Sequence, residues 1–160
     1  MAVISVKDLC RVYKLGKVDV HALNGVTLEI TEGEFVGIMG PSGSGKSTLL
    51  YQMSLLDRPT SGSVLIQGRD VGGLTDHQRT RFRLNHCGYV FQDYALVPEL
   101  TTEENVFLLP MAQGKPDTES IEQSREILGK VGLSNRLSHL PRELSGGEQQ
   151  RVAIARAMVN

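Results

Sequence analysis

The stretch Gly40–Thr48 constrains this chain more than any other. It matches the pattern G-x-x-x-x-G-K-[ST], which is typical of loops that bind phosphate groups. The apolar run at 34–39 before it predicts a buried strand, and the run at 46–56 after it predicts a helix. Glycines let successive backbone N–H groups turn inward around a phosphate, and the positive end of the helix dipole strengthens that attraction. We therefore predict a nucleoside-triphosphate site at this stretch.

Every residue of the stretch has a place in this prediction. We expect the phosphates to be held by Gly40, Pro41, Ser42, Gly43, Ser44, Gly45, Lys46, Ser47 and Thr48. Lys46 can reach the outer phosphates as a point charge, and the Ser47 hydroxyl can ligate Mg²⁺. The alternative is a glycine-rich turn that matches by chance, which happens in about one in a hundred chains of this length at average glycine usage.

Composition narrows the class of protein. At 160 residues, with 40% hydrophobic and 22% charged residues, the chain has the size of one ordinary domain and enough apolar material for a core. A formal net charge of −1 gives no electrostatic reason to expect nucleic acid or an anionic membrane as a partner. Cys10 and Cys87 have no metal-ligand spacing, so we expect buried, reduced thiols in a cytosolic protein. There is no signal-peptide pattern and no apolar run long enough to span a membrane, so any membrane role is expected to come through a partner.

The first part of the chain predicts β-strands. Residues 2–13 and 24–30 are expected to be strands around a loop that contains Gly16, with a turn at Asn24-Gly25 before the second strand. Further short strands are expected at 64–66 and 88–91. The first two strands indicate an antiparallel, hairpin-like region ahead of the strand that leads into the phosphate loop.

The second part predicts helices. A polar helix is expected at 75–84, and its arginines are expected to form a solvated face: Arg79, Arg81 and Arg83. A helix that begins with a capping box, a loop around Pro110 and a helix at 117–131 follow. We therefore expect a subdomain boundary between Gln92 and Leu100.

A second motif opens the last predicted helix. Ser145 and Glu148 have the spacing of a capping box, in which each side chain bonds the other residue's backbone N–H. Gly146 and Gly147 are poor helix formers, so their use at a helix start calls for a reason. They leave the N–H groups there bare, and a second polyphosphate could approach them closely. An ordinary capped helix explains the residues equally well, and the physical chemistry alone leaves both interpretations open.

The run Leu144–Ala157, Leu-Ser-Gly-Gly-Glu-Gln-Gln-Arg-Val-Ala-Ile-Ala-Arg-Ala, closely resembles the signature motif and helix of ATP-binding-cassette ATPases. The phosphate loop and Gln92 precede it in that family's order and approximate spacing, and the resemblance covers the whole chain. Leu56–Gly62 and Val90–Asp93 resemble the branch that contains the ATPase subunits of lipoprotein-releasing, macrolide-export and cell-division-type systems.

The resemblance implies an α/β fold, with a RecA-like P-loop NTPase core, an antiparallel β subdomain and a helical subdomain. It implies a nucleotide-binding core with the β subdomain at 1–92 and a helical subdomain with the signature helix at 93–160. The family's pattern continues beyond Asn160 with a Walker B aspartate and a catalytic glutamate, so the core looks incomplete and the C-terminal part of the ATPase domain looks missing. We therefore expect residues 1–160 alone to bind nucleotide without turning it over.

The resemblance also implies roles for single residues. Gln92 would ligate Mg²⁺ together with Ser47 and begin the loop that senses the transport subunit, whereas a glutamine at a strand end is otherwise usually a loop hydrogen-bonder. Tyr13 matches the aromatic residue that stacks on adenine; taken alone, it would be a strand-end tyrosine with a solvated hydroxyl. Ser145, with Gly146 and Gly147, would act on ATP held by another subunit, so that the catalytic set is Lys46, Gln92 and Ser145. None of the four histidines matches a catalytic position, and we expect surface or loop positions for them.

The function that the resemblance implies is ATP hydrolysis coupled to substrate movement. ATP and Mg²⁺ are the implied cofactors. Membrane-spanning transporter subunits and a head-to-tail homodimer (or a paired ATPase) around two ATP are the implied partners, with no nucleic acid. The membrane-spanning partners would place the protein at the cytoplasmic, inner face of the plasma membrane. The alternatives are a non-hydrolysing nucleotide-binding or regulatory module and, ranked last because it has no need of the signature stretch, a P-loop kinase.

Overall fold

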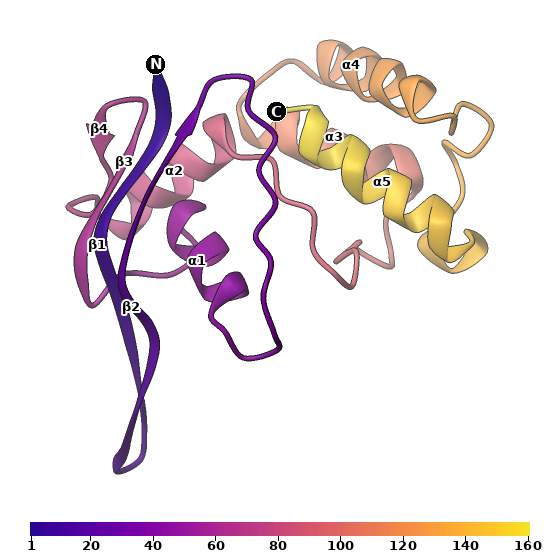
Figure 1. Cartoon of the computed structure of the whole chain (residues 1–160). Helices are drawn as coiled ribbons and strands as arrows, with labels where there is room; N and C mark the ends of the chain where they lie inside the picture. The colour runs from indigo at the N-terminus through magenta and orange to yellow at the C-terminus, as the bar shows by residue number, and fades with distance from the viewer. The chain divides into compact units, whose positions relative to one another are not determined.

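A long antiparallel hairpin begins the chain in the computed structural model, which describes residues 1–160. Strand β1 (Ala2–Leu15) pairs with β2 (Val18–Thr31) across a turn at Gly16, and β1 also pairs with β3 (Ser61–Ile66). The short β4 (Arg69–Asp70) completes a four-stranded sheet in the order β2-β1-β3-β4, with every pair antiparallel (Figure 1). The predicted antiparallel β subdomain is therefore confirmed.

The turn predicted at Asn24-Gly25 is wrong, because these residues lie inside β2. The register of the β1–β2 pair shifts on either side of the pairs Leu9–Val26 and Arg11–Leu23, and Gly25 has a φ of 72°. A glycine in the left-handed conformation within a ladder is the mark of a β-bulge, which inserts an extra residue and increases the local twist. The same sequence signal thus bends a strand instead of ending it.

The sheet packs its inner face against a short helix. Helix α1 (Lys46–Met53) follows the phosphate loop, and it is shorter than the predicted 46–56 because Leu55 turns into the left-handed region with a φ of 58°. The side chains that form this core are buried and apolar: Val6, Leu9, Leu49, Met53, Leu55, Val64 and Ile66. Burial of this apolar surface is what stabilises so small a sheet.

The strands predicted at 34–39 and 88–91 are not formed. Phe35 and Met39 are 99% and 92% exposed, and no strand of the chain pairs with this segment. A buried strand of a parallel sheet needs hydrogen-bonding neighbours and covered faces, and an apolar run without them has no ladder to join. The run is apolar, but pairing with neighbouring strands decides whether such a run becomes a strand.

Helices make up most of the second half of the chain. Helix α2 (Asp76–His86) is followed by α3 (Thr102–Ala112), α4 (Asp117–Lys130), a 3₁₀ turn at Pro141–Glu143 and α5 (Gly146–Met158) (Figure 1). The core that α3, α4 and α5 share consists of Val106, Leu128, Leu133, Leu144, Val152, Ala155 and Val159. The predicted capping box is confirmed and is formed by Thr101 and Glu104, and Gly132, with a φ of 73°, follows the C-cap of α4.

Two details of the helical prediction are wrong. Pro110, which was predicted to lie in a loop, lies inside the last turn of α3 and is buried. The helix ends only beyond it, where the backbone N–H groups of Gln113 and Gly114 donate to helix carbonyls. Arg79, which was predicted to lie on a solvated face, is only 4% exposed. Its Nη2 donates to the carbonyl oxygens of Leu55 (2.8 Å) and Asp57 (2.6 Å). Arginine has five donors, so it can satisfy the carbonyls that the end of α1 leaves unpaired.

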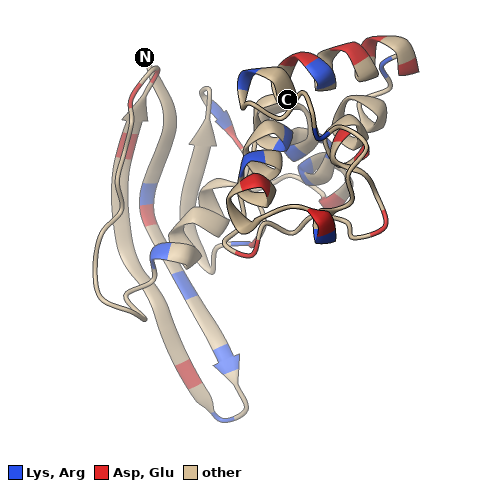
Figure 2. Cartoon of the chain, turned by 90° about the vertical axis from the view of Figure 1, so that its right-hand side faces the viewer, with Lys and Arg blue, Asp and Glu red and all other residues tan.

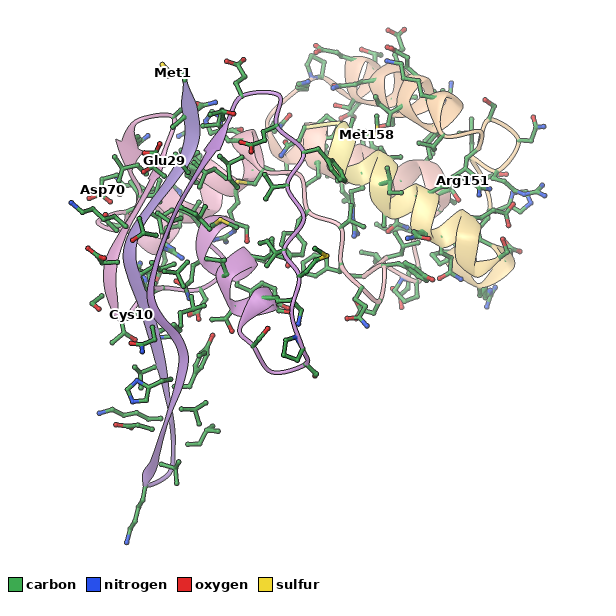
Figure 3. All side chains as sticks on the ribbon, viewed as in Figure 1. Met1, Cys10, Glu29, Asp70, Arg151 and Met158 are labelled. Carbon is green, nitrogen blue, oxygen red and sulfur yellow. The ribbon has the colours of Figure 1, made fainter.

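The chain divides into two compact units, Met1–Arg79 and Thr80–Asn160, whereas the predicted subdomain boundary lies between Gln92 and Leu100. Positively and negatively charged residues alternate along the ribbon (Figure 2). Cys10, on β1 (Figure 3), and Cys87 are free and half-buried, and burial raises the pKa of the Cys87 thiol. None of the helices combines the length and apolar character needed to cross a membrane.

Candidate nucleotide-binding site

The phosphate loop is shaped by glycines in conformations that other residues rarely adopt. The φ angles of Gly40, Gly43 and Gly45 are 153°, 81° and 86°. A Cβ atom on Gly45 would lie 2.3 Å from the carbonyl oxygen of Ala22 on β2, so both the conformation and the packing require glycine there. Gly45 is also the N-cap of α1, and no side chain caps that helix. The first backbone N–H groups of α1 are therefore left for a ligand.

Lys46 is the first residue of α1 and folds back over the loop. Its Nζ donates to the carbonyl oxygens of Gly40 (3.0 Å) and Pro41 (2.6 Å). These two bonds fix the ammonium group above the loop while it keeps a third donor. A cation held in this way, next to uncapped helix amides, produces a field that attracts anions.

A pocket of about 280 Å³ opens over the loop. Six of its lining residues come from the predicted phosphate stretch: Ser42, Gly43, Gly45, Lys46, Ser47 and Thr48. The other three, Val20, His21 and Ala22, come from β2, which the sequence did not connect with the site. His21 was expected to be an uninvolved surface or loop histidine. It borders the pocket because the β-bulged strand passes beside the loop, and no local pattern signals that long-range approach.

Tyr13 lies one strand away from this pocket. In the register of the hairpin it stands directly opposite Val20, one of the lining residues. Its hydroxyl donates to Asp57 Oδ2 at 2.7 Å, so the solvated hydroxyl considered for a strand-end tyrosine is wrong. The guanidinium of Arg11 lies 4.3 Å from the centre of the Tyr13 ring, within the range of a cation–π contact.

The carboxylate of Asp57 is the anchor of this cluster. Besides Tyr13 it accepts two bonds from Arg11 (2.8 and 2.9 Å), one from Gln52 Nε2 (3.0 Å) and one from the backbone N of Arg58 (2.7 Å). Burial opposes ionisation, but the hydrogen bonds from Tyr13 and Arg58 and the charge of Arg11 hold the pKa of Asp57 below its usual value. The cluster thus fixes Tyr13 through a residue 44 positions away in sequence.

The signature stretch begins α5 as predicted. Ser145 Oγ accepts from the N of Glu148 (3.4 Å), while Glu148 Oε2 accepts from the N (2.8 Å) and Oγ (2.7 Å) of Ser145. The nearest atoms to a Cβ on Gly146 or Gly147 would lie at 3.6 and 3.9 Å, so neither glycine is required by crowding. Their small size keeps this helix start open instead.

Glu148 is strongly acidic in this setting. Hydrogen bonds from Ser145, and then from Arg136 Nε at 2.9 Å, lower its pKa to about 2. The carboxylate therefore stays ionised at the start of α5, where the helix dipole also favours negative charge. Gln92, the remaining predicted site residue, has an exposed side chain and lies in the second unit with Ser145.

The phosphate loop, the uncapped helix behind it and the capped signature helix together define a P-loop nucleotide-binding ATPase. Residues 23–160 match the family described as ABC transporter, and the chain belongs to that family as an ATP-binding subunit. The predicted fold class, the family and the ATPase function are thus confirmed, and the comparisons give no support to a non-hydrolysing module.

Curated relatives align over nearly the whole chain. An uncharacterised ABC transporter ATP-binding protein of Thermotoga maritima is 51% identical over 99% of this chain and 68% of its own length. The lipoprotein-releasing system ATP-binding proteins LolD 2 of Caulobacter vibrioides and LolD of Geobacter metallireducens are 48% and 49% identical. Both align with 99% of this chain, and with 69% and 70% of their own lengths respectively.

Solved structures agree in fold. The dimeric structure of MJ0796, a bacterial ABC transporter cassette, has a TM-score of 0.92 and 43% identity, over 98% of this chain and 69% of that one. A second structure of MJ0796, described as a post-hydrolysis state bound to ADP and Pi, matches equally well.

Proposed function

We propose that this chain is the ATP-binding subunit of a lipoprotein-releasing type of ABC system, and that Gly40–Thr48 holds the phosphates of ATP. The observation that carries the proposal is the glycine loop closed by Lys46, whose Nζ lies 2.6 Å from the Pro41 carbonyl oxygen above an uncapped helix start. The first amides of α1 have no side-chain cap and lie beside the Lys46 ammonium, so the residues present fit a polyphosphate. The names of the two LolD relatives support lipoprotein release as the process.

In this proposal Mg²⁺ is held by the Ser47 hydroxyl and the Gln92 side-chain oxygen. Both are hard oxygen donors, the ligand type that Mg²⁺ prefers. When bound, the ion neutralises charge on the phosphates during transfer. Lys46 supplies a second positive charge to the outer phosphates, and the Tyr13 ring provides an apolar face for adenine beside Val20.

We also propose that two copies of the subunit close head to tail around two ATP molecules. Ser145, Gly146 and Gly147 of one copy would then face the nucleotide held by Lys46 of the other. The dimeric cassette of the relative MJ0796 supports this assembly. Membrane-spanning subunits would hold the dimer at the cytoplasmic face of the membrane. Residues 1–92 would serve as the nucleotide-binding core and 93–160 as the helical subdomain.

Isothermal titration of ATP into the Lys46→Ala variant tests the site. Hydrogen bonds to charged groups contribute about 1.5–3 kcal/mol, so we expect ATP affinity to fall roughly 10- to 150-fold. The matched control is Lys17→Ala, which removes the same charge from the exposed turn between β1 and β2 and should leave affinity unchanged. Equal affinities for both variants, each with a native melting curve, would overturn the assignment.

A further inference from the structure

Two consecutive residues just after Gln92 have backbone conformations that are unfavourable for their side chains. Tyr94 and Ala95 have φ angles of 63° and 45°. The backbone N of Ala95 donates to the carbonyl oxygen of Asp93 at 2.7 Å, which closes a three-residue turn around Tyr94. Turns of this kind with a positive φ at the centre are rare and strained. We refer to Asp93–Ala95 as the Tyr94 turn.

Strained residues persist only where the surrounding structure over-determines them, and Arg156 of α5 does so here. Its Nη2 donates to the Tyr94 carbonyl oxygen at 2.8 Å, and its Nη1 donates to the Ala95 carbonyl oxygen at 2.7 Å. The planar guanidinium presents its donors in a fixed geometry, so one side chain can bond both neighbouring carbonyls. Arg156 is partly buried, and this burial lowers its pKa. Such a desolvated guanidinium depends on these carbonyls for its hydrogen bonds.

The Tyr94 side chain also lies close to the start of α5. A Cβ on Gly146, the first residue of α5, would lie 3.6 Å from the Tyr94 hydroxyl oxygen. Gly146 and Arg156 are ten residues apart, or about 15 Å along a helix. One turn can lie near both residues for two reasons. Helical side chains such as that of Arg156 lean toward the helix N-terminus, and the Tyr94 side chain ends near Gly146.

We propose that Arg156 and Tyr94 are positioning residues that clamp the loop beginning at Gln92 to the signature helix. Through this clamp, a displacement of Ser145 at the start of α5 is transmitted to Gln92, which precedes Tyr94 by two residues. The inference rests on the proposed roles of Gln92 and Ser145 and adds a mechanical connection between them. Neither positioning residue touches nucleotide in this scheme.

Amide hydrogen exchange in the Arg156→Gln variant tests the clamp. Loss of the two bonds should speed exchange at the Tyr94 and Ala95 amides by roughly 10- to 100-fold. The Val97 amide is an internal control, since it donates to Asn105 Oδ1 at 2.8 Å and should stay protected. Arg151→Gln, which removes an exposed arginine from the same helix (Figure 3), should change neither.

A glycine substitution separates the clamp from a general loss of stability. Ala95→Gly relieves the strain at one of the two residues with positive φ, so the turn should depend less on Arg156. We expect Ala95→Gly to recover part of the protection at residues 94 and 95 that Arg156→Gln loses. Gln67→Gly, at a residue with a φ of 51° outside the turn, should recover none. Unchanged exchange in Arg156→Gln, or equal recovery by both glycines, would overturn the clamp.

Turnover by the whole ATPase domain, carrying the same substitutions and assembled with its membrane partners, tests the positioning role. Arg156→Gln should lower kcat roughly tenfold and leave the KM for ATP within about twofold, and Ala95→Gly should restore part of the kcat. A kcat unchanged despite open exchange at the Tyr94 turn would show that the clamp is structural only. Failure of the proposed function is seen separately, since Lys46→Ala would then leave ATP affinity unchanged whatever the exchange rates show.

Discussion

The Tyr13–Asp57 cluster predicts that the hydroxyl and the ring of Tyr13 contribute to different properties. The hydroxyl donates a 2.7 Å bond to an ionised carboxylate, whereas the proposed role of the ring is to stack on adenine. Tyr13→Phe removes only the first contribution, and Tyr13→Ala removes both. The two variants should therefore separate stability from ATP affinity.

The size of each effect follows from the contacts. A hydrogen bond to a charged group contributes about 1.5–3 kcal/mol. Asp57 is 23% exposed and keeps donors from Arg11, Gln52 and Arg58, so we expect the lower end, about 1.5 kcal/mol, for Tyr13→Phe. For a chain of this length that is a fall in melting temperature of about 3–6 °C. Stacking of a base on an aromatic ring contributes about 1–3 kcal/mol to binding. Its loss in Tyr13→Ala should therefore also weaken ATP binding roughly 5- to 150-fold.

Thermal unfolding and nucleotide titration on the same samples are the assays. Tyr13→Phe should melt earlier and bind ATP within about threefold of the unsubstituted chain, while Tyr13→Ala should weaken ATP and GTP alike, because stacking tolerates any base. Tyr13→Trp should retain binding. Normal ATP binding by Tyr13→Ala would show that the ring serves only the hairpin, and equal losses for Phe and Ala would assign the effect to the hydroxyl.

Two further predictions concern the loop and the signature helix. Gly45→Ala should destabilise the chain and weaken ATP binding more than Gly33→Ala, because both glycines have positive φ but only Gly45 would place a Cβ against another residue's backbone. Equal melting curves and ATP titrations for the two variants would contradict this. The Glu148 pKa of about 2 lies below the ordinary value of about 4.3, so its stabilisation is present above that ordinary value and lost as the pH falls toward 2. Acid titration of the melting temperature should be flatter for Glu148→Gln over this interval; parallel curves would refute the assignment.

The parts of the site that sequence predicted are those that depend on local chemistry. The glycines of the phosphate loop and the Ser145–Glu148 capping box depend on conformations and bonds within a few residues, so their spacing alone signals them. The antiparallel hairpin and the helices at 102–112 and 117–130 followed from periodicity and caps. These elements need little information from the rest of the chain.

The features that sequence missed depend on contacts between distant residues. Arg79 belongs to an arginine cluster on a polar helix, but carbonyls at the end of α1 hold it in the interior. The bond from Tyr13 to Asp57 and the approach of His21 to the phosphate loop depend equally on how β1 and β2 bend. The apolar run at 34–39 has the composition of a strand but no pairing partner in the fold. Tertiary contacts decide such cases, and a single sequence does not contain them in local form.

The most direct test of the account is whether two defective copies complement each other in an ATP-driven dimer. Lys46→Ala disables the phosphate loop, and Ser145→Arg blocks the signature start while sparing ATP binding by the monomer. Neither variant should dimerise alone, as measured by light scattering with ATP and Mg²⁺. An equimolar mixture should form a dimer held by one ATP, because one of its two sites pairs the intact Lys46 of one copy with the intact Ser145 of the other, while the second site carries both defects. A mixture that stays monomeric while the unsubstituted protein dimerises would contradict the proposal that the site is shared between two copies.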